Sequence, residues 1–243
     1  MPMFLKKLTL LQEKIPHDSK YPFSIPAIKH LRELTFQKSV TFFVGENGSG
    51  KSTLLEAIAD KCEFNTAGGG RNNTYEVHAS ESSLGDYLRL SWLPKITNGF
   101  FLRAESFYHF ATHLEEVDNT GFIHYGGRSL HEQSHGESFL SLFKHRFNER
   151  GIYLLDEPEA ALSPARQLAF LKIIHDLTRN NEAQFIIASH SPILLGYPDA
   201  EIFSFDGDAI SEVSYENTDH YTLTKYFLQH REKLLAELFS EDV

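Results

Sequence analysis

The most informative stretch of this sequence is Gly45-Glu46-Asn47-Gly48-Ser49-Gly50-Lys51-Ser52. It fits the phosphate-loop pattern G-x-x-x-x-G-K-[ST]. A short β-branched and aromatic run, residues 39–44, precedes the pattern, and helical periodicity follows it over residues 50–59. The glycines let successive backbone N–H groups face one centre, and the helix N-terminus adds about half a positive charge. We therefore expect residues 45–53, Thr53 included, to bind the phosphates of a nucleotide.

Two side chains of this loop indicate which ligands it would take. The Lys51 ammonium is expected to reach the β- and γ-phosphates of ATP. The Ser52 hydroxyl is expected to ligate Mg²⁺. The loop therefore predicts ATP and Mg²⁺ as cofactors.

A buried strand that ends on two carboxylates is predicted to supply the rest of a hydrolytic site. Residues 152–155 form an apolar run, and Asp156-Glu157 follow it. Ligands of α/β folds bind at the carboxyl ends of such strands. We predict that Asp156 holds Mg²⁺, directly or through water, and that Glu157 polarises the attacking water.

The order of the remaining elements indicates an α/β fold. Ser163-Pro164 offers a cap and a first-turn proline for a helix that runs to about residue 179. Residues 185–188 form another short apolar run. Two such strands joined by a helix predict a parallel βαβ unit with both faces of the sheet covered.

Other segments give weaker signals. We expect a strand over residues 4–11 in an N-terminal antiparallel β part, a loop over 67–73, a hairpin over 202–205 and 209–213, and a closing amphipathic helix over 221–238. Residues from about 80 to 149 mix aromatic and polar positions without a strong period. We expect a mostly helical lobe there.

Composition limits the class of protein. The 243 residues suit one sizeable α/β domain, and 41% hydrophobic and 23% charged residues are ordinary globular values. No apolar stretch approaches the roughly 18 residues of a membrane span, and residues 1–11 lack the layout of a signal peptide. With a single cysteine, Cys62, the sequence favours a soluble, cytoplasmic protein. A net charge of −10 disfavours nonspecific nucleic-acid binding, but a local basic patch stays open.

With these motifs the chain resembles the ABC-ATPase superfamily. A further segment is similar to the family's Leu-Ser-Gly-Gly-Gln signature motif, and it reads Gln133-Ser134-His135-Gly136-Glu137. His135 stands for the first glycine, Gln133 for the leucine and Glu137 for the glutamine. The resemblance implies that Ser134 and Gly136 contact a γ-phosphate.

Two later segments extend the resemblance. Residues 160–163 follow Asp156-Glu157-Pro158 where the family has its D-loop, with Ser163 in place of the usual aspartate. Ala188-Ser189-His190-Ser191-Pro192 resembles the switch-histidine loop, which implies that His190 senses the γ-phosphate. Lys51, Ser134, Asp156 and His190 follow one another at intervals of 83, 22 and 34 residues, in the family's order. The resemblance covers about residues 36–215. Within the superfamily, the motifs look like those of small stand-alone bacterial predicted ATPases.

The resemblance implies a single ABC-type ATPase domain over residues 1–243. Its fold would be that of a P-loop NTPase, with a mainly parallel core sheet, flanking helices, the N-terminal antiparallel β part and a helical signature lobe inserted at about 80–149. It also implies a homodimer that sandwiches ATP. Ser134 and Gly136 of one protomer would then complete the site on Lys51, Ser52 and Asp156 of the other.

Three assignments stay open. A strand over residues 100–104 precedes no glutamine, so Glu105 is the candidate for the family's Q-loop position, with a capping or surface carboxylate as the alternative. Tyr21 or Phe23 would stack on adenine, unless they belong to the core. Arg71 would reach the nucleotide or a partner, unless it is a solvated loop residue.

Rival motifs are weaker. His131-Glu132-Gln133-Ser134-His135 fits the zinc-protease pattern H-E-x-x-H, which requires a continuous helix and a third ligand. Gly126, Gly127 and Gly136 argue against that helix. His109 and His113 share i, i+4 spacing, but Phe110 occupies the glutamate position. Cys62 has no cysteine partner and is interpreted as a buried small residue.

The sequence thus predicts an ATPase that converts ATP and water to ADP and phosphate. A stand-alone role in stress, defence or nucleic-acid metabolism is favoured, with an unknown protein partner. The first alternative is the ATP-binding subunit of an ABC transporter, which requires a transmembrane partner. A chromosome-maintenance ATPase needs a long coiled coil that 83 residues cannot hold. A non-hydrolysing nucleotide sensor is the last alternative, against which Glu157 argues.

Overall fold

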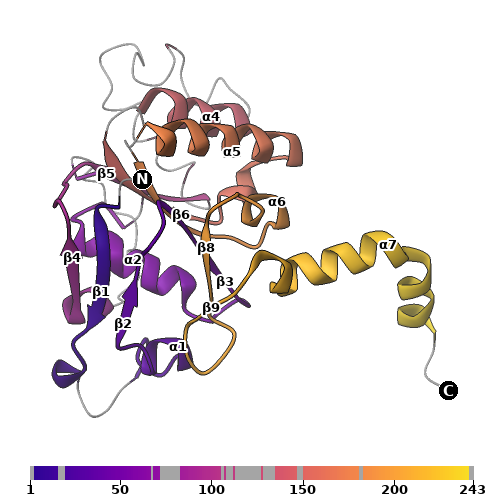
Figure 1. Cartoon of the computed structure of the whole chain (residues 1–243), viewed down its shortest axis with the longest axis horizontal. Coiled ribbons are helices and arrows are strands. Elements are labelled where there is room, and N and C mark those ends of the chain that lie inside the picture. The colour runs from indigo at the N-terminus through magenta and orange to yellow at the C-terminus, as the bar shows by residue number, and fades with distance from the viewer. Residues whose placement is uncertain are drawn as a thin grey trace.

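The computed structural model describes residues 3–15, 20–66, 68–71, 83–104, 107, 112, 127, 135–146, 150–180 and 183–240. Over these residues two sheets and their helices form the body of the molecule, and one helix projects from it (Figure 1). The described α-helices are α1 (Pro26–Lys29), α2 (Lys51–Lys61), α4 (His135–Arg146), α5 (Pro164–Arg179), α6 (Pro192–Leu195) and α7 (Asp219–Phe239). The described 3₁₀ helices are η1 (Gln12–Lys14), η2 (Ser83–Tyr87), η6 (Pro158–Ala161) and η7 (Tyr215–Asn217).

The central sheet has six strands in the order β5-β6-β7-β3-β8-β9. Their bounds are β3 Val40–Val44, β5 Gly99–Arg103, β6 Gly151–Asp156, β7 Ala183–Ala188, β8 Glu201–Ser204 and β9 Ser211–Glu212. The pairs from β5 to β8 are parallel, and β9 runs antiparallel to β8. Every residue of β3, β6 and β7 is buried, which is why these strands read as apolar runs. The expected mainly parallel sheet, its βαβ unit and the β8–β9 hairpin are confirmed.

A second sheet, which is antiparallel, contains the first strand of the chain and has the strand order β2-β1-β4. It consists of β1 (Leu5–Leu10), β2 (Glu33–Thr35) and β4 (Leu88–Trp92). Gln184 of β7 ties this sheet to the central one. Its Oε1 accepts hydrogen bonds from the backbone N–H groups of Phe4 and Leu5, both at 2.9 Å, and its Nε2 donates to the Leu5 carbonyl at 3.0 Å. The expected N-terminal antiparallel β part is therefore confirmed.

Strands β4 and β5 correct the expected extent of the helical lobe. Residues 80–149 were expected to be mostly helical, but Leu88–Trp92 pairs with β1 and Gly99–Arg103 pairs with β6. A strand over residues 100–104 is expected from the sequence, and β5 agrees with it. Strand β4 is not expected, because only Leu88 among its five residues is buried and its partner β1 is distant in sequence. Helix α4 agrees with the expectation, and most residues between 104 and 135 lie outside the described ones.

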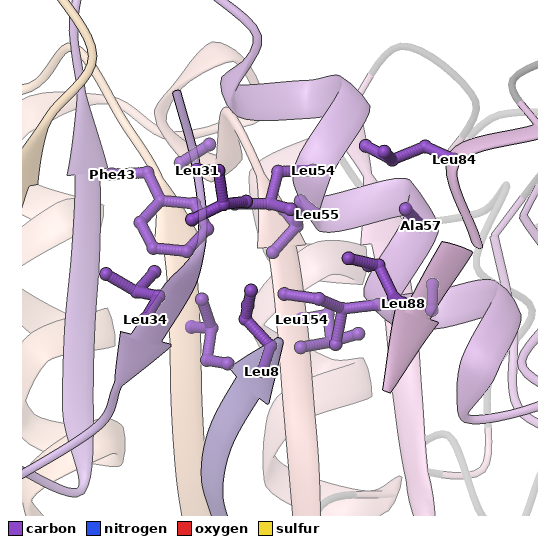
Figure 2. Close-up of a cluster of buried hydrophobic side chains, with 14 of the residues drawn as sticks. Leu8, Leu31, Leu34, Phe43, Leu54, Leu55, Ala57, Leu84, Leu88 and Leu154 are labelled. Atoms are coloured by element: carbon purple, nitrogen blue, oxygen red, sulfur yellow. The ribbon is translucent and has the colours of Figure 1, made fainter. Parts of the chain in front are cut away.

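Helix α2 lies between the two sheets. Figure 2 shows its Leu54 and Leu55 against Leu8 and Leu34 of the antiparallel sheet and Leu154 of the central sheet. The opposite face of the central sheet is covered by α4, α5 and α6, whose packed aromatic rings include Phe139, Phe143 and Phe170. Each face of the sheet therefore has its own apolar core, and the sheet fixes α2 and the loop before it.

Helix α7 projects away from the body (Figure 1). None of its 21 residues is buried, and its backbone is non-helical at His230, where φ is −130°. Leu223, Leu228 and Phe239 are each more than three-fifths exposed. The expected C-terminal helix is confirmed, but it covers no sheet. No helix in the described part of the chain is long and apolar enough to span a membrane.

Candidate functional site

The loop between β3 and α2 has the backbone shape that a phosphate site requires. Gly50, at the N-cap of α2, has a φ of +103°, and a Cβ there would lie 3.1 Å from the Ile25 side chain. Gly45 has a φ of +142°, and a Cβ there would lie 2.9 Å from the Asp206 carboxylate. Glycine is needed at both positions because left-handed backbone and close packing coincide. The loop thus turns directly into the N-terminus of α2.

The Lys51 side chain is buried inside this loop. Its ammonium donates to the backbone carbonyls of Gly45 at 2.6 Å and Glu46 at 2.9 Å. Burial lowers the pKa of Lys51, and nearby carboxylates, first Glu157 and then Asp156, oppose that change. A lysine ammonium is a compact point charge that an anion can contact. Lys51 therefore lies where a phosphate in the loop could replace its carbonyl contacts.

Ser52, Asp156 and Arg103 form the next part of the site. The Ser52 hydroxyl donates to Asp156 Oδ1 at 2.9 Å, and Arg103 Nε lies 3.1 Å from Asp156 Oδ2. Arg103 Nη2 also lies 3.4 Å from Glu56 on α2. Burial raises the pKa of Asp156, and Arg103 and the Ser52 hydrogen bond oppose this rise. Two hard oxygen ligands, a hydroxyl and a carboxylate, thus converge as a Mg²⁺ site requires.

Sequence patterns did not identify Arg103. It is paired in register with Asp156 because β5 and β6 are parallel neighbours that end together. The available signal was a cation directly after the apolar run at residues 100–102, in the strand that precedes the Q-loop candidate Glu105. Glu105, the Q-loop candidate, lies outside the described residues.

Glu157 has a strained backbone. Its φ and ψ are 51° and 50°, in the left-handed region, and its N–H donates to the Ala188 carbonyl at 2.9 Å. Such strain in a residue other than glycine persists only where the surrounding structure enforces it. The Glu157 side chain is 46% exposed, and its Oε1 lies 3.5 Å from His190 Nε2. The carboxylate therefore projects from the strand end next to the histidine that follows β7.

His190 is held by a second carboxylate. Its backbone N–H donates to Glu159 Oε1 at 2.5 Å. Burial raises the pKa of Glu159, and hydrogen bonds, first from the His190 backbone, oppose that rise. Glu159 belongs to none of the motifs recognised in the sequence, although it lies two residues after Glu157, beside the same strand end. Glu159 joins the η6 segment to the His190 loop.

The arrangement fits Mg²⁺-bound nucleotide. A cleft of about 510 Å³ adjoins the strand ends, lined by Ser52, Arg103, Ala104, Phe107, Asp156, Glu157, Ala160 and Ala161. The Ser49 hydroxyl of the loop and Nε2 of His190 are buried with no hydrogen-bond partner among the described residues. Buried polar atoms require partners, and phosphate oxygens would supply them. Lys51, Ser52, Asp156, Glu157 and His190 are therefore brought together as the sequence predicted.

The signature segment is described only in part. Gly136, in the first turn of α4, is buried, and a Cβ there would lie 2.5 Å from Arg166 Nη1 and 3.1 Å from the Ala161 carbonyl. The signature glycine thus packs against the segment that follows Glu157. Residues 131–134, which include Ser134, lie outside the described residues, as do His109 and His113. Among the described residues no group of three histidine, cysteine or acidic side chains could hold a metal ion.

The structure separates the residues left open by the sequence. Phe23 is buried and packs edge-on to Tyr87 with ring centroids 5.0 Å apart, so it belongs to the core. Tyr21 is 60% exposed, and its hydroxyl lies 3.2 Å from Thr53 Oγ1 beside the loop. Arg71 instead holds the end of α2, because its Nε donates to the Cys62 carbonyl. The Cys62 thiol is buried, which raises its pKa to about 12.

Two family models match the chain. One, described as "AAA domain", matches residues 24–98, and the other, described as "AAA domain, putative AbiEii toxin, Type IV TA system", matches residues 125–196. None of the curated proteins matches this sequence.

Two solved structures show where the fold recurs. One is cbiO1 from Clostridium perfringens, part of the ABC transporter complex cbiONQ, which is 16% identical with a TM-score of 0.53 over 96% of this chain and 99% of that one. The other is an ATP-binding cassette of an ABC transporter in its ADP conformation, 17% identical with a TM-score of 0.51 over 98% of this chain and all of that one. At these identities the likeness shows a shared fold.

Proposed function

We propose that this chain, which has the P-loop NTPase fold of the ABC-type ATPases, binds Mg-ATP and hydrolyses it as a homodimer that closes around the nucleotide. One observation carries the proposal. Lys51, Ser52, Asp156, Glu157 and His190 come from three separate segments and meet at the carboxyl ends of β3, β6 and β7. Open α/β sheets bind their ligands at this edge.

The phosphates would be bound by the loop of residues 45–53. Lys51 would exchange its contacts with the Gly45 and Glu46 carbonyls for the β- and γ-phosphates, and the N-terminus of α2 adds a favourable dipole. Ser52 and Asp156 would hold Mg²⁺, which supplies charge neutralisation of the phosphates when bound. The exposed ring of Tyr21 is the remaining candidate for stacking on adenine.

Hydrolysis would depend on Glu157 and His190. The strained backbone of Glu157 aims its carboxylate away from β6, where it can accept a proton from water. Nε2 of His190, buried and without a hydrogen-bond partner among the described residues, would donate to the γ-phosphate. The transferring phosphoryl group is thereby stabilised by positioned donors, which is the main requirement of this chemistry.

The second protomer would complete each site. By its resemblance to the family signature, Ser134 with Gly136 of the partner protomer would contact the γ-phosphate, so ATP would favour closure and hydrolysis would release it. A stand-alone role in stress, defence or nucleic-acid metabolism fits this switch. The family description that names a toxin of a type IV toxin–antitoxin system favours defence among these roles.

The variant Glu157→Gln tests the proposal. Its amide is a poor base, so hydrolysis should fall by about 10² to 10⁴, while binding survives because Lys51, Ser52 and Asp156 are unchanged. Size-exclusion chromatography with Mg-ATP should show a dimer, and adding Ser134→Arg should abolish it. A monomer at saturating ATP would reject the shared site. Full turnover would reject Glu157 as the catalytic carboxylate.

A further inference from the structure

A second histidine lies against His190. His220 is the second residue of α7, 30 residues further along the chain, and its Nε2 lies 2.9 Å from Nδ1 of His190. The two rings are tilted by 56° with centroids 5.0 Å apart. On its other side the His190 ring presents Nε2 to Glu157 at 3.5 Å. The His190 ring is therefore held between the base of α7 and the candidate catalytic carboxylate.

The hydrogen bond between two histidines restricts where the protons lie. One ring nitrogen must donate and the other must accept. If neutral His190 donated from Nδ1, its Nε2 lone pair would face the Glu157 carboxylate, which is unfavourable. If His220 donates from Nε2 instead, His190 carries its proton on Nε2, directed at Glu157 and at the expected γ-phosphate. Of these two neutral arrangements, only the second directs an N–H of His190 toward Glu157.

The charges around His220 agree with this donor role. His190, Asp206, Lys51 and Asp219 face it from the switch loop, the β8–β9 hairpin, α2 and α7. Burial is the main cause that lowers the pKa of His220, and His190 and Lys51 lower it further, while Asp206 and Asp219 oppose the change. A lowered pKa favours the neutral ring, and a neutral imidazole can carry its single proton on Nε2.

The base of α7 is anchored on the same loop. The Tyr215 hydroxyl donates to the Pro192 carbonyl at 2.8 Å, two residues after His190. The Thr218 side chain caps α7 by accepting from the Tyr221 N–H at 3.3 Å. Beyond this first turn no α7 residue is buried. A shift of the His190 ring would therefore act on the start of a helix whose main other contacts with the body are with α6 and η7.

We propose that His220 is a positioning residue for His190. It holds the His190 ring with its Nε2–H toward Glu157 and the γ-phosphate, and it links the nucleotide site to α7. The proposal rests on the ATPase function proposed above. It goes beyond that function by giving a role to His220, which would not touch the nucleotide and would act through the His190 side chain.

Two variants separate positioning from structure. His220→Leu removes the donor, and we expect kcat to fall by about 10- to 100-fold, because a misplaced catalytic group costs that much. KM for ATP should change little, since Lys51 and Ser52 are untouched. His220→Gln keeps an N–H at a similar reach and should restore most of the rate. The matched control is His230→Ala, an exposed histidine further along α7 whose loss should leave kcat unchanged.

A measurement without nucleotide tests the pairing independently of hydrolysis. Long-range ¹H–¹⁵N spectra of the imidazole rings should show His190 protonated on Nε2 in the wild type, and a mixture of tautomers in His220→Leu. An Nδ1–H tautomer in the wild type would overturn the proposal even if the protein hydrolyses ATP. Equal kcat in wild type and a folded His220→Leu would also overturn it. If the wild type shows no ATPase activity but the expected tautomer, the proposed function fails and the pairing stands.

Discussion

Arg103 places a cation between two buried carboxylates, Asp156 and Glu56. Burial alone would raise the pKa of Asp156 further, so Arg103 helps to keep this carboxylate ionised. Mg²⁺ binds the ionised form, and protonation therefore competes with the metal. Arg103 thus belongs to the electrostatics of the site although no motif contains it.

We predict that Arg103→Ala moves the acidic limb of Mg²⁺-dependent ATP binding to higher pH. Without the guanidinium the pKa of Asp156 rises, so a higher pH is needed to ionise the ligand. Isothermal titration with Mg-ATP across mildly acidic to neutral pH measures the limb. Arg103→Lys retains the charge and serves as the control. A limb that moves to lower pH, or stays in place, contradicts the prediction.

The sequence predicted those site residues whose chemistry is local. Lys51, Ser52 and Asp156-Glu157 follow strands in recognisable patterns, and their neighbours in the chain suffice to identify them. Arg103 and His220 were not predicted, because each acts through a side chain on another element. Strand register brings Arg103 to Asp156, and the packing of α7 brings His220 to His190. A sequence motif does not reveal either contact, because each contact joins residues that are far apart in the chain.

At the scale of elements, Gln184 joins two sheets that differ in topology. Its amide is fully buried and makes three hydrogen bonds to the backbone of residues 4 and 5. A buried backbone group that loses its partner is costly. One side chain of β7 therefore ties the N-terminal end of β1 to the central sheet.

Replacing Gln184 by Leu should destabilise the protein by about 2 to 4 kcal/mol, because backbone groups at Phe4 and Leu5 lose their partners in the interior. Urea denaturation followed by circular dichroism measures the free energy of unfolding. The exposed glutamine on α7, changed as Gln229→Leu, is the control and should alter stability by less than about 0.5 kcal/mol. Equal effects of the two changes would contradict the role of Gln184.

Helix α7 gives a contrasting prediction. A chain shortened to residues 1–229 loses no buried position among the described residues 230–240, and we expect its free energy of unfolding to stay within about 0.5 kcal/mol of the full chain. ATPase activity should persist, because His220 and the first turn remain. Denaturation at low protein concentration and steady-state assays check this. A loss above about 2 kcal/mol would mean that the distal half of α7 is packed in solution.

The sequence predicted the strong elements and missed the weak ones for a physical reason. The strands β3, β6 and β7 are buried on both faces, so each appears in the sequence as a nearly continuous run of apolar residues. Strand β4 has one buried residue, Leu88, so its signal is slight. The amphipathic pattern of residues 221–238 predicted the helix α7 correctly. It did not predict that α7 projects from the body, because this depends on how the rest of the chain packs.

At the scale of the molecule, nucleotide binding should stabilise the entire fold. The site joins β3, β6 and β7, which lie side by side in the central sheet. We expect Mg-ATP at 100 times its Kd to add about 2.7 kcal/mol, and so to raise Tm by roughly 5 to 10 °C. Lys51→Ala should fold, by circular dichroism, and show no such rise.

Thermal unfolding with EDTA in place of Mg²⁺ is the companion measurement. Without Mg²⁺ the proposed metal contacts of Ser52 and Asp156 cannot form, so most of the ATP-dependent rise in Tm should disappear. The wild type without nucleotide is the reference for both samples. A rise in Lys51→Ala equal to that of the wild type would place the nucleotide elsewhere on the molecule.

The position of β3 also governs when the molecule can assemble. Its two neighbours are β7, where Val40 pairs with Phe185, and β8, where Thr41 pairs with Glu201. Contacts so distant in sequence form slowly, because a long loop must close first. During synthesis β3 therefore emerges with neither partner and stays an exposed apolar segment until the C-terminal strands leave the ribosome. We therefore expect the phosphate loop to reach its final form only after β7 and β8 have been made, because those strands hold β3 in place.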